Sequence, residues 1–206
     1  MSTPLPEPHP GLLAVGGYNQ ARRHHKKFDA VLTCEDPSTR DRLRVKGGTQ
    51  LVLAFEDCDD ITLGYRVATL EDMKLALEFE RAHRTGAVLV HCFHGVGRSA
   101  AVALMAHADR LGRGKEQEAV GALMVQRPEA TPNLIAVDLA DQLLGREGAL
   151  SAALRAYETL HPAKLLARRR RLAFARENPG LFAKLEISQP SPKNGKQSHQ
   201  SRLFAV

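Results

Sequence analysis

Four short apolar runs alternate with longer amphipathic segments along most of the chain. The runs are rich in Val, Leu, Ala and Phe, and they predict strands at residues 12–15, 28–34, 51–55 and 87–91. The segments place apolar residues three or four positions apart, and they predict helices at residues 69–86, 99–111, 115–126 and 134–144. Strands that alternate with helices are typical of a largely parallel sheet flanked by helices, so we expect an α/β fold.

The last of these strands leads into a loop with the features of an anion site. Cys92 opens the loop, five residues separate it from Arg98, and Ser99 follows at the predicted helix start. Gly95 and Gly97 allow the backbone to curl so that its N–H groups point inward as a nest for anions. The helix N-terminus adds its positive dipole end, which also favours a thiolate. The pattern predicts a site for a tetrahedral dianion with a sulfur nucleophile at its base.

The side chains of this loop have distinct expected roles. Arg98 offers a planar fork that can grip two oxygens of a phosphate. Ser99 can donate a hydrogen bond to the sulfur when it leaves, and His91 is expected to orient the loop rather than to carry protons. The expected phosphate-binding residues are Phe93, His94, Gly95, Val96, Gly97 and Arg98.

Two plainer interpretations are weaker. Cysteine is among the most buried residue types, so Cys92 could be a structural thiol. The joint match of five restricted positions argues against that, namely His91, Cys92, Gly95, Arg98 and Ser99. A metal site built on His91, Cys92 and His94 lacks a second pair of ligands at zinc-like spacing. We therefore expect neither a metal nor another cofactor.

The His-Cys-x5-Arg-Ser pattern at residues 91–99 resembles the signature of cysteine-dependent protein tyrosine phosphatases, in particular the compact, dual-specificity-like bacterial branch. The chain has no Trp, so the Trp-Pro-Asp acid loop of the larger tyrosine-specific branch is absent. The segment Arg127-Pro128 to Pro132-Asn133, followed by Gln142-Leu143, is similar to one in dual-specificity phosphatases. The resemblance spans roughly residues 10–148. It implies a dual-specificity phosphatase-like fold.

The resemblance also implies an Asp general acid in a loop upstream of the cysteine. An acidic run at residues 56–60 follows the third predicted strand. Asp57, 35 residues before Cys92, is the expected acid because it comes two residues after the last aromatic of that strand. Asp59 and Asp60 stay open as alternatives, and a solvated acidic loop is the plainer interpretation. We expect the crowding of four carboxylates to favour their protonated forms.

Charge is distributed unevenly along the chain. Residues 1–160 hold 19 Lys and Arg against 21 Asp and Glu, whereas residues 161–206 hold 10 against 2, so the net charge of +6 comes from the C-terminal end. A basic helix with an apolar side is predicted at 164–176, and a Ser-, Pro- and Lys-rich stretch at 188–200 predicts disorder. The expected organisation is a catalytic domain at 1–148, a helical basic extension at 149–186 and a disordered tail at 187–206.

Cysteine usage and the absence of targeting signals limit the compartment and the partners. Cys34, Cys58 and Cys92 form no disulfide framework, which is typical of a reducing compartment. The sequence shows no signal peptide and no apolar run of 18 residues. We expect a cytoplasmic monomer with no specific nucleic-acid partner. The basic extension is expected either to contact an anionic surface or partner, or to be a helix docked on the body.

The residues and the resemblance together predict hydrolysis of phosphate monoesters through a phosphocysteine. Protein phosphotyrosine is the favoured substrate, with phosphoserine and phosphothreonine also considered. The loop positions Phe93, His94 and Val96 include no lysine, which disfavours the alternative of an inositol phosphate or phosphoinositide. Two other classes stay open: an inactive phosphate-binding module, and a sulfurtransferase or arsenate reductase.

The resemblance further implies that Cys34 or Cys58 protects an oxidised Cys92 as a disulfide, although a buried inert thiol is the plainer interpretation.

Overall fold

The computed structural model describes residues 3–39 and 41–185, so the tail predicted at 187–206 lies outside the described residues. Four strands form one parallel sheet in the order β1-β4-β2-β3. Their bounds are Leu13–Gly17 (β1), Ala30–Glu35 (β2), Thr49–Ala54 (β3) and Val88–Cys92 (β4). The predicted α/β fold with a parallel central sheet is confirmed.

Seven helices surround this sheet within the described residues. They are Tyr18–His24 (α1), Leu70–His83 (α2), Arg98–Leu111 (α3), Glu116–Gln126 (α4), Leu134–Leu143 (α5), Ala149–Leu160 (α6) and Pro162–Glu177 (α7). Short 3-10 turns occupy His25–Lys27, Pro37–Thr39, Ile61–Leu63 and Pro179–Leu181. The sequence pattern did not predict α1, because Ala21 is the only buried residue of this helix.

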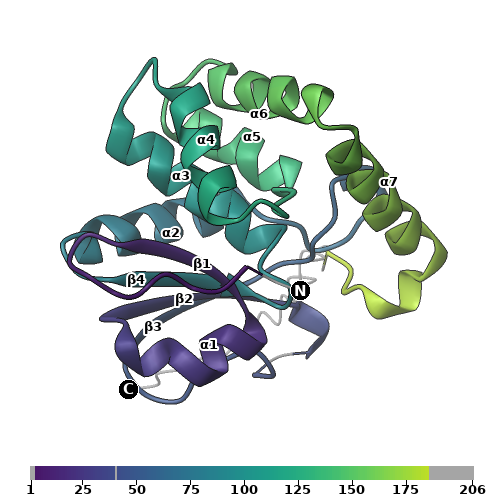
Figure 1. The fold of residues 1–206 in the computed structure, drawn as a ribbon. Coiled ribbons are helices and arrows are strands. Elements are labelled where there is room, and N and C mark those ends of the chain that lie inside the picture. The colour runs from purple at the N-terminus through teal and green to yellow at the C-terminus, as the bar shows by residue number, and fades with distance from the viewer. Residues whose placement is uncertain (1–2, 40, 186–206) are drawn as a thin grey trace, which may run out of the picture.

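The two faces of the sheet bury different sets of side chains, as the alternation along a strand requires. Helix α1 covers one face, and helices α2 to α6 cover the other (Figure 1). Leu13 and Val15 of β1 point to the larger core, whereas Ala14 between them packs on the side of α1. Both faces are therefore dry at β1, β2 and β4, which explains why these strands are largely apolar, whereas the edge strand β3 is partly exposed.

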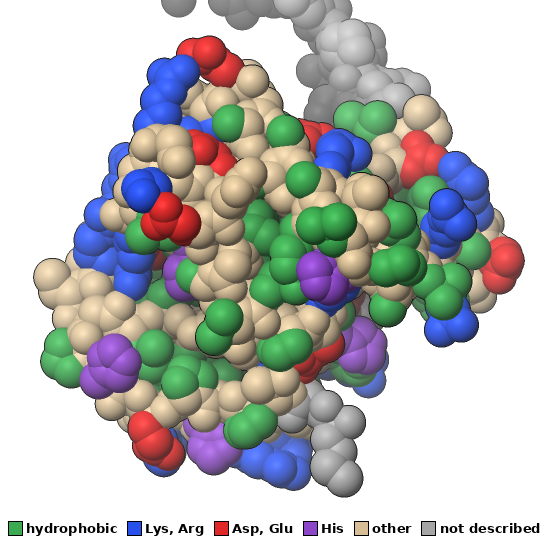
Figure 2. Space-filling model, turned by 45° about the horizontal axis from the view of Figure 1, so that its top comes forward, with side chains coloured by type: hydrophobic (Ala, Val, Ile, Leu, Met, Phe, Trp, Pro, Cys, Tyr) green, Lys and Arg blue, Asp and Glu red, His purple; other side chains and the backbone are tan. Residues whose placement is uncertain are grey.

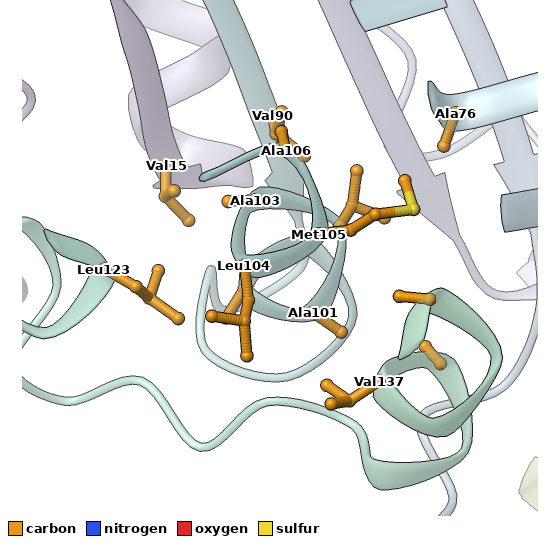
Figure 3. Packing of buried hydrophobic residues seen from close by; sticks show 14 of the residues in the cluster. Val15, Ala76, Val90, Ala101, Ala103, Leu104, Met105, Ala106, Leu123 and Val137 are labelled. Atoms are coloured by element: carbon orange, nitrogen blue, oxygen red, sulfur yellow. The ribbon is translucent and has the colours of Figure 1, made fainter. Parts of the chain in front are cut away.

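Helix α3 passes through the centre of the larger core (Figure 3). Ala101, Ala103 and Ala106 are fully buried, and their small side chains let the helix approach the sheet closely. Leu104 and Met105 fill the space between α3 and its neighbours. Because α3 begins directly after the loop that follows β4, this packing fixes the loop at the carboxyl edge of the sheet, where ligands bind in such folds.

The two helices after residue 148 pack on the body in different ways. Leu150 and Leu154 of α6 are fully buried in the same core as α3, so α6 shares the core of the domain. Helix α7 stands at the end of the sheet where the strands terminate, beside the loop that follows β3 (Figure 1). The domain boundary at 148 stays a prediction. Within the described residues, no helix is both long and apolar enough to cross a membrane.

Candidate active site

The loop at residues 93–97 joins β4 to α3 and turns its carbonyl groups outward. Phe93 O accepts a hydrogen bond from the Tyr18 amide at 3.0 Å, and Gly97 O accepts one from the Asn133 amide at 3.2 Å. The Thr131 amide donates to Val96 O at 2.7 Å. Because the carbonyls face the surrounding chain, the N–H groups turn inward, which forms a nest for an anion.

Cys92 lies at the base of this nest with two donors on its sulfur. The Gly95 amide donates to Sγ at 3.2 Å, and the Ser99 hydroxyl donates to it at 3.1 Å. Hydrogen bonds to a sulfur favour its thiolate form. Gly95 has φ of +77°, and a Cβ there would lie 2.5 Å from the Gly16 carbonyl carbon, so the loop requires glycine at this position.

Arg98 is buried and is anchored on one side only. Its Nη1 donates to Phe55 O at 3.0 Å and pairs with Asp36 Oδ1 at 2.8 Å, while its Nε is buried and makes no hydrogen bond within the described residues. Burial opposes the charge of Arg98, but Cys92 and Asp36 keep its pKa above the ordinary value. The pairing of Asp36 with Arg98 could not be predicted from the sequence, because Asp36 follows a strand and belongs to no recognisable motif.

Arg127 fixes the outside of the loop. It is almost completely buried, and it donates to Gly95 O and His94 O, each at 3.1 Å. It also donates to Gln20 Oε1 at 3.1 Å, which ties the loop to α1. Burial lowers the pKa of Arg127. The Arg127-Pro128 pattern in the sequence does not predict this contact with the loop.

Asp57 packs on the nucleophile loop at Gly97. Its Oδ1 accepts a hydrogen bond from Asn133 Nδ2 at 3.1 Å and pairs with Arg171 Nη1 at 3.5 Å. The Asp57 carboxyl group packs so tightly on Gly97 that a Cβ there would overlap with Oδ2. Oδ1 therefore faces two cationic or amide donors, whereas Oδ2 lies against the backbone of Gly97.

The neighbouring carboxylates have other partners. Asp59 is buried; burial raises its pKa, but Arg171 at 2.5 Å and Arg168 at 2.7 Å outweigh that and lower it. Asp60 accepts from the Thr62 hydroxyl at 2.6 Å, and this hydrogen bond lowers its pKa. The expectation that crowding favours the protonated forms is therefore wrong for Asp59 and Asp60, because cations and hydrogen-bond donors compensate their charge. Burial raises the pKa of Glu56, and this is the main cause of its shift.

His91 connects β4 to the neighbouring strand. Its Nε2 and the Thr33 hydroxyl share a hydrogen bond of 2.8 Å, and Gln50 Nε2 donates to the same hydroxyl at 3.1 Å. His91 is fully buried, and burial lowers its pKa to about 4. The ring is therefore neutral near pH 7 and holds the strand just before Cys92, which agrees with an orienting role.

The rim of the nest is aromatic. Phe93 is 43% exposed and packs edge-on against His94, with ring centroids 4.6 Å apart. This rim offers an apolar contact next to the anion nest.

The other two cysteines differ in their relation to Cys92. Cys34 follows Thr33 on β2, and Thr33 pairs with His91 on β4, so Cys34 lies beside Cys92 in the same buried cluster. Burial, followed by the charge of Cys92, raises the pKa of Cys34. Cys58 packs in a separate cluster with Tyr65. All three thiols are free.

No protein-family model and no curated protein matches the chain. Several solved structures do match it. A structure of DUSP15 has 18% identity and a TM-score of 0.51, and the match covers 76% of this chain and 96% of that one. The human tyrosine phosphatase-like serine/threonine/tyrosine-interacting protein has 18% identity and a TM-score of 0.52, with coverage of 63% and 89%.

A structure of PTPMT1 in complex with PI(5)P has 18% identity and a TM-score of 0.51, and the match covers 68% of this chain and 96% of that one. Identities this low carry information about the fold alone. The chain therefore has a dual-specificity phosphatase-like fold, which confirms the resemblance at the level of the fold.

Proposed function

We propose that this protein hydrolyses phosphate monoesters through a phosphocysteine at Cys92, with protein phosphotyrosine as its favoured substrate. The observation that carries the proposal is the convergence of two hydrogen-bond donors and a backbone nest at the sulfur of Cys92, with the charge of Arg98 acting on the same sulfur. Such a site stabilises a thiolate in the ground state and the negative charge of a phosphoryl group in the transition state.

In the first step the Cys92 thiolate attacks phosphorus while the bond from phosphorus to the leaving oxygen breaks. The inward amides of residues 93–98 and the free side of Arg98 bind the three equatorial oxygens. Asp57 Oδ2 gives its proton to the leaving oxygen, because this carboxyl oxygen lies against Gly97 of the nucleophile loop. Asp57 is therefore the proposed general acid, in preference to Asp59 and Asp60, whose oxygens are held by arginines and by Thr62.

In the second step the ionised Asp57 takes a proton from a water molecule that attacks the phosphocysteine. The bond from sulfur to phosphorus breaks, and inorganic phosphate leaves. The Ser99 hydroxyl at 3.1 Å stabilises the departing thiolate of Cys92. The same carboxyl group thus acts as acid and then as base, which restores the starting protonation state.

The rim supports an aryl phosphate as substrate. Phe93 exposes its ring beside the nest, where it can contact the phenyl ring of phosphotyrosine. The loop residues 93–97 include no lysine to bind further phosphate groups of a polyphosphorylated substrate.

Hydrolysis of p-nitrophenyl phosphate in the presence of a chelator tests the proposal. We expect turnover that vanadate inhibits, no turnover for Cys92→Ser, and a loss of about 10²-fold or more for Asp57→Ala. Phosphotyrosine peptides are then compared with phosphoserine peptides, inositol phosphates and PI(5)P vesicles. Undiminished turnover of Cys92→Ser would contradict the mechanism. Phosphate binding by a wild-type protein that shows no turnover would favour the phosphate-binding module.

A further inference from the structure

The basic helix α7 connects the two segments that support the active site. Arg171 Nη1 donates to Thr131 O at 2.8 Å and pairs with Asp57 Oδ1 at 3.5 Å, while its Nη2 pairs with Asp59 at 2.5 Å. The Thr131 amide in turn donates to Val96 O in the anion nest. One guanidinium group therefore joins the acidic loop to the segment that holds the nucleophile loop.

Arg168, one turn earlier on α7, strengthens the same connection. It pairs with Asp59 Oδ2 at 2.7 Å, pairs with Glu158 of α6, and donates to Pro132 O at 2.9 Å. The two arginines face two carboxylates, those of Asp59 and Glu158. Because these charges balance, the network can hold Asp57 without adding a large net positive charge next to a group that must be protonated for the first step.

The last turn of α7 and the chain beyond it hold the acidic loop from its other side. The Tyr65 hydroxyl donates to Ala175 O at 2.7 Å, and the Tyr65 ring stacks on Phe182 with centroids 4.7 Å apart. The Ala183 amide donates to Glu56 Oε1 at 2.8 Å, and Ala183 O accepts from the Arg66 amide at 2.9 Å. The loop between β3 and α2 is thus fixed by contacts to the C-terminal segment at both of its ends.

The arginine run on α7 divides into two pairs. Arg168 and Arg171 point inward to the carboxylates, whereas Arg169 and Arg170 between them are exposed and make no salt bridge within the described residues. Figure 2 shows basic and apolar side chains intermixed at the edge of the molecule where α7 lies. The exposed pair supplies matched controls on the same helix turn.

We propose that Arg171 is a positioning residue for the general acid, so that the basic C-terminal extension is a part of the catalytic centre. The inference rests on the proposed function, in which Asp57 is the acid. Arg171 and Asn133 both occupy Oδ1 of Asp57, and this keeps Oδ2 over Gly97 and toward the leaving oxygen. Arg171 acts through Asp57 and touches no reacting atom.

A leaving-group series separates this role from a merely structural one, because proton donation matters most for poor leaving groups. For Arg171→Met we expect kcat for phenyl phosphate to fall about 10-fold to 100-fold, and kcat for 2,4-dinitrophenyl phosphate to fall less than about threefold. Arg169→Met should match wild type for both substrates, and Arg171→Lys should recover part of the loss.

A double-mutant cycle with Asp57→Ala tests whether Arg171 works through the acid. In the Asp57→Ala background, Arg171→Met should change kcat for phenyl phosphate by less than about twofold. An equal loss in both backgrounds, or the same loss for both leaving groups, would overturn the inference.

Hydrogen exchange provides a readout that does not depend on turnover. Amides of residues 56–64 should exchange faster in Arg171→Met than in wild type or Arg169→Met, while amides of α3 should not change. An inactive wild-type protein would refute the proposed function. Unchanged exchange in Arg171→Met would refute the inference by itself.

Discussion

The carboxyl group of Asp57 packs directly on the backbone of Gly97. A Cβ at position 97 would overlap with Oδ2 and lie 2.6 Å from Cγ of Asp57, so this contact depends on the absence of a side chain. Gly97 is the residue before α3, and its carbonyl also accepts the Asn133 amide. The acidic loop and the nucleophile loop therefore meet through one glycine.

Gly97→Ala is expected to push Asp57 away from the nest and to leave the nucleophile in place. We expect kcat for phenyl phosphate to fall about 10²-fold, which is the size of a general-acid contribution. The rate of Cys92 alkylation by iodoacetamide should stay near that of wild type. Gly121→Ala on α4 is the control, because a Cβ there meets no atom within 4 Å. Wild-type activity in Gly97→Ala would show that the carboxyl group does not need this position.

Asn133 performs two tasks that two substitutions can separate. Its Oδ1 accepts the Ala136 amide at 3.0 Å and caps α5, while its Nδ2 donates to Asp57 at 3.1 Å. Asn133→Ser keeps a capping oxygen and loses the Nδ2 donor, which also donates to Cys58 O at 3.1 Å. We therefore expect a roughly 10-fold loss of kcat and a loss of unfolding free energy that is smaller than in Asn133→Ala. Asn133→Ala loses both and should destabilise the fold by a further ~1 kcal/mol.

Urea unfolding and steady-state kinetics on the two Asn133 variants measure these effects. The separation of roles fails if Asn133→Ser retains full activity, or if its stability drops as far as that of Asn133→Ala.

Two buried histidines make stability dependent on pH. Burial lowers the pKa of both His91 and His107 to about 4, while an unfolded histidine titrates near 6.5. Between these values the unfolded chain binds protons that the native chain does not. The contribution of the two histidines to the free energy of unfolding is therefore complete above pH 6.5, and it is lost as the pH falls toward 4. Each histidine contributes a slope of up to about 1.4 kcal/mol per pH unit.

Urea unfolding at pH 7, 6 and 5 measures this slope. His107→Gln should lower it by about the contribution of one histidine. If the variant and the wild type share one slope, His107 titrates in the native state near its ordinary pKa, contrary to the burial argument.

Oxidation is expected to link Cys92 to Cys34 and not to Cys58. Peroxide converts the Cys92 thiolate to a sulfenic acid, and the neighbouring thiol then attacks this sulfur and releases water. Cys34 lies beside Cys92 in the sheet, whereas Cys58 packs with Tyr65 in another cluster. Non-reducing peptide mass spectrometry should find the 34–92 pair in wild type and none in Cys34→Ser. A 58–92 peptide, or no Cys92-linked peptide, would contradict this expectation.

Local patterns in the sequence determined the elements and the nucleophile loop. The apolar runs predicted the four strands. Both faces are buried at β1, β2 and β4, which are largely apolar, and the edge strand β3 keeps an apolar run at residues 51–54 although it is partly exposed. The loop at 93–97 is short and contains its own glycines, so its curl around Cys92 and Arg98 is encoded within a few residues. Helix α1 was not predicted, because it buries a single alanine and therefore shows no apolar periodicity in the sequence.

Only the tertiary structure decided which carboxylates of the acidic run at residues 56–60 are paired with arginines and which one lies at the nucleophile loop. Asp57, Asp59 and Asp60 are nearly equivalent in the sequence, and their different surroundings come from Asn133 and from arginines more than 100 residues away. An arginine run that is solvated and one that docks on carboxylates have the same local pattern. Only the packing of α7 against the acidic loop distinguishes them, because this packing selects which carboxylates are neutralised and leaves one oxygen of Asp57 over the nucleophile loop.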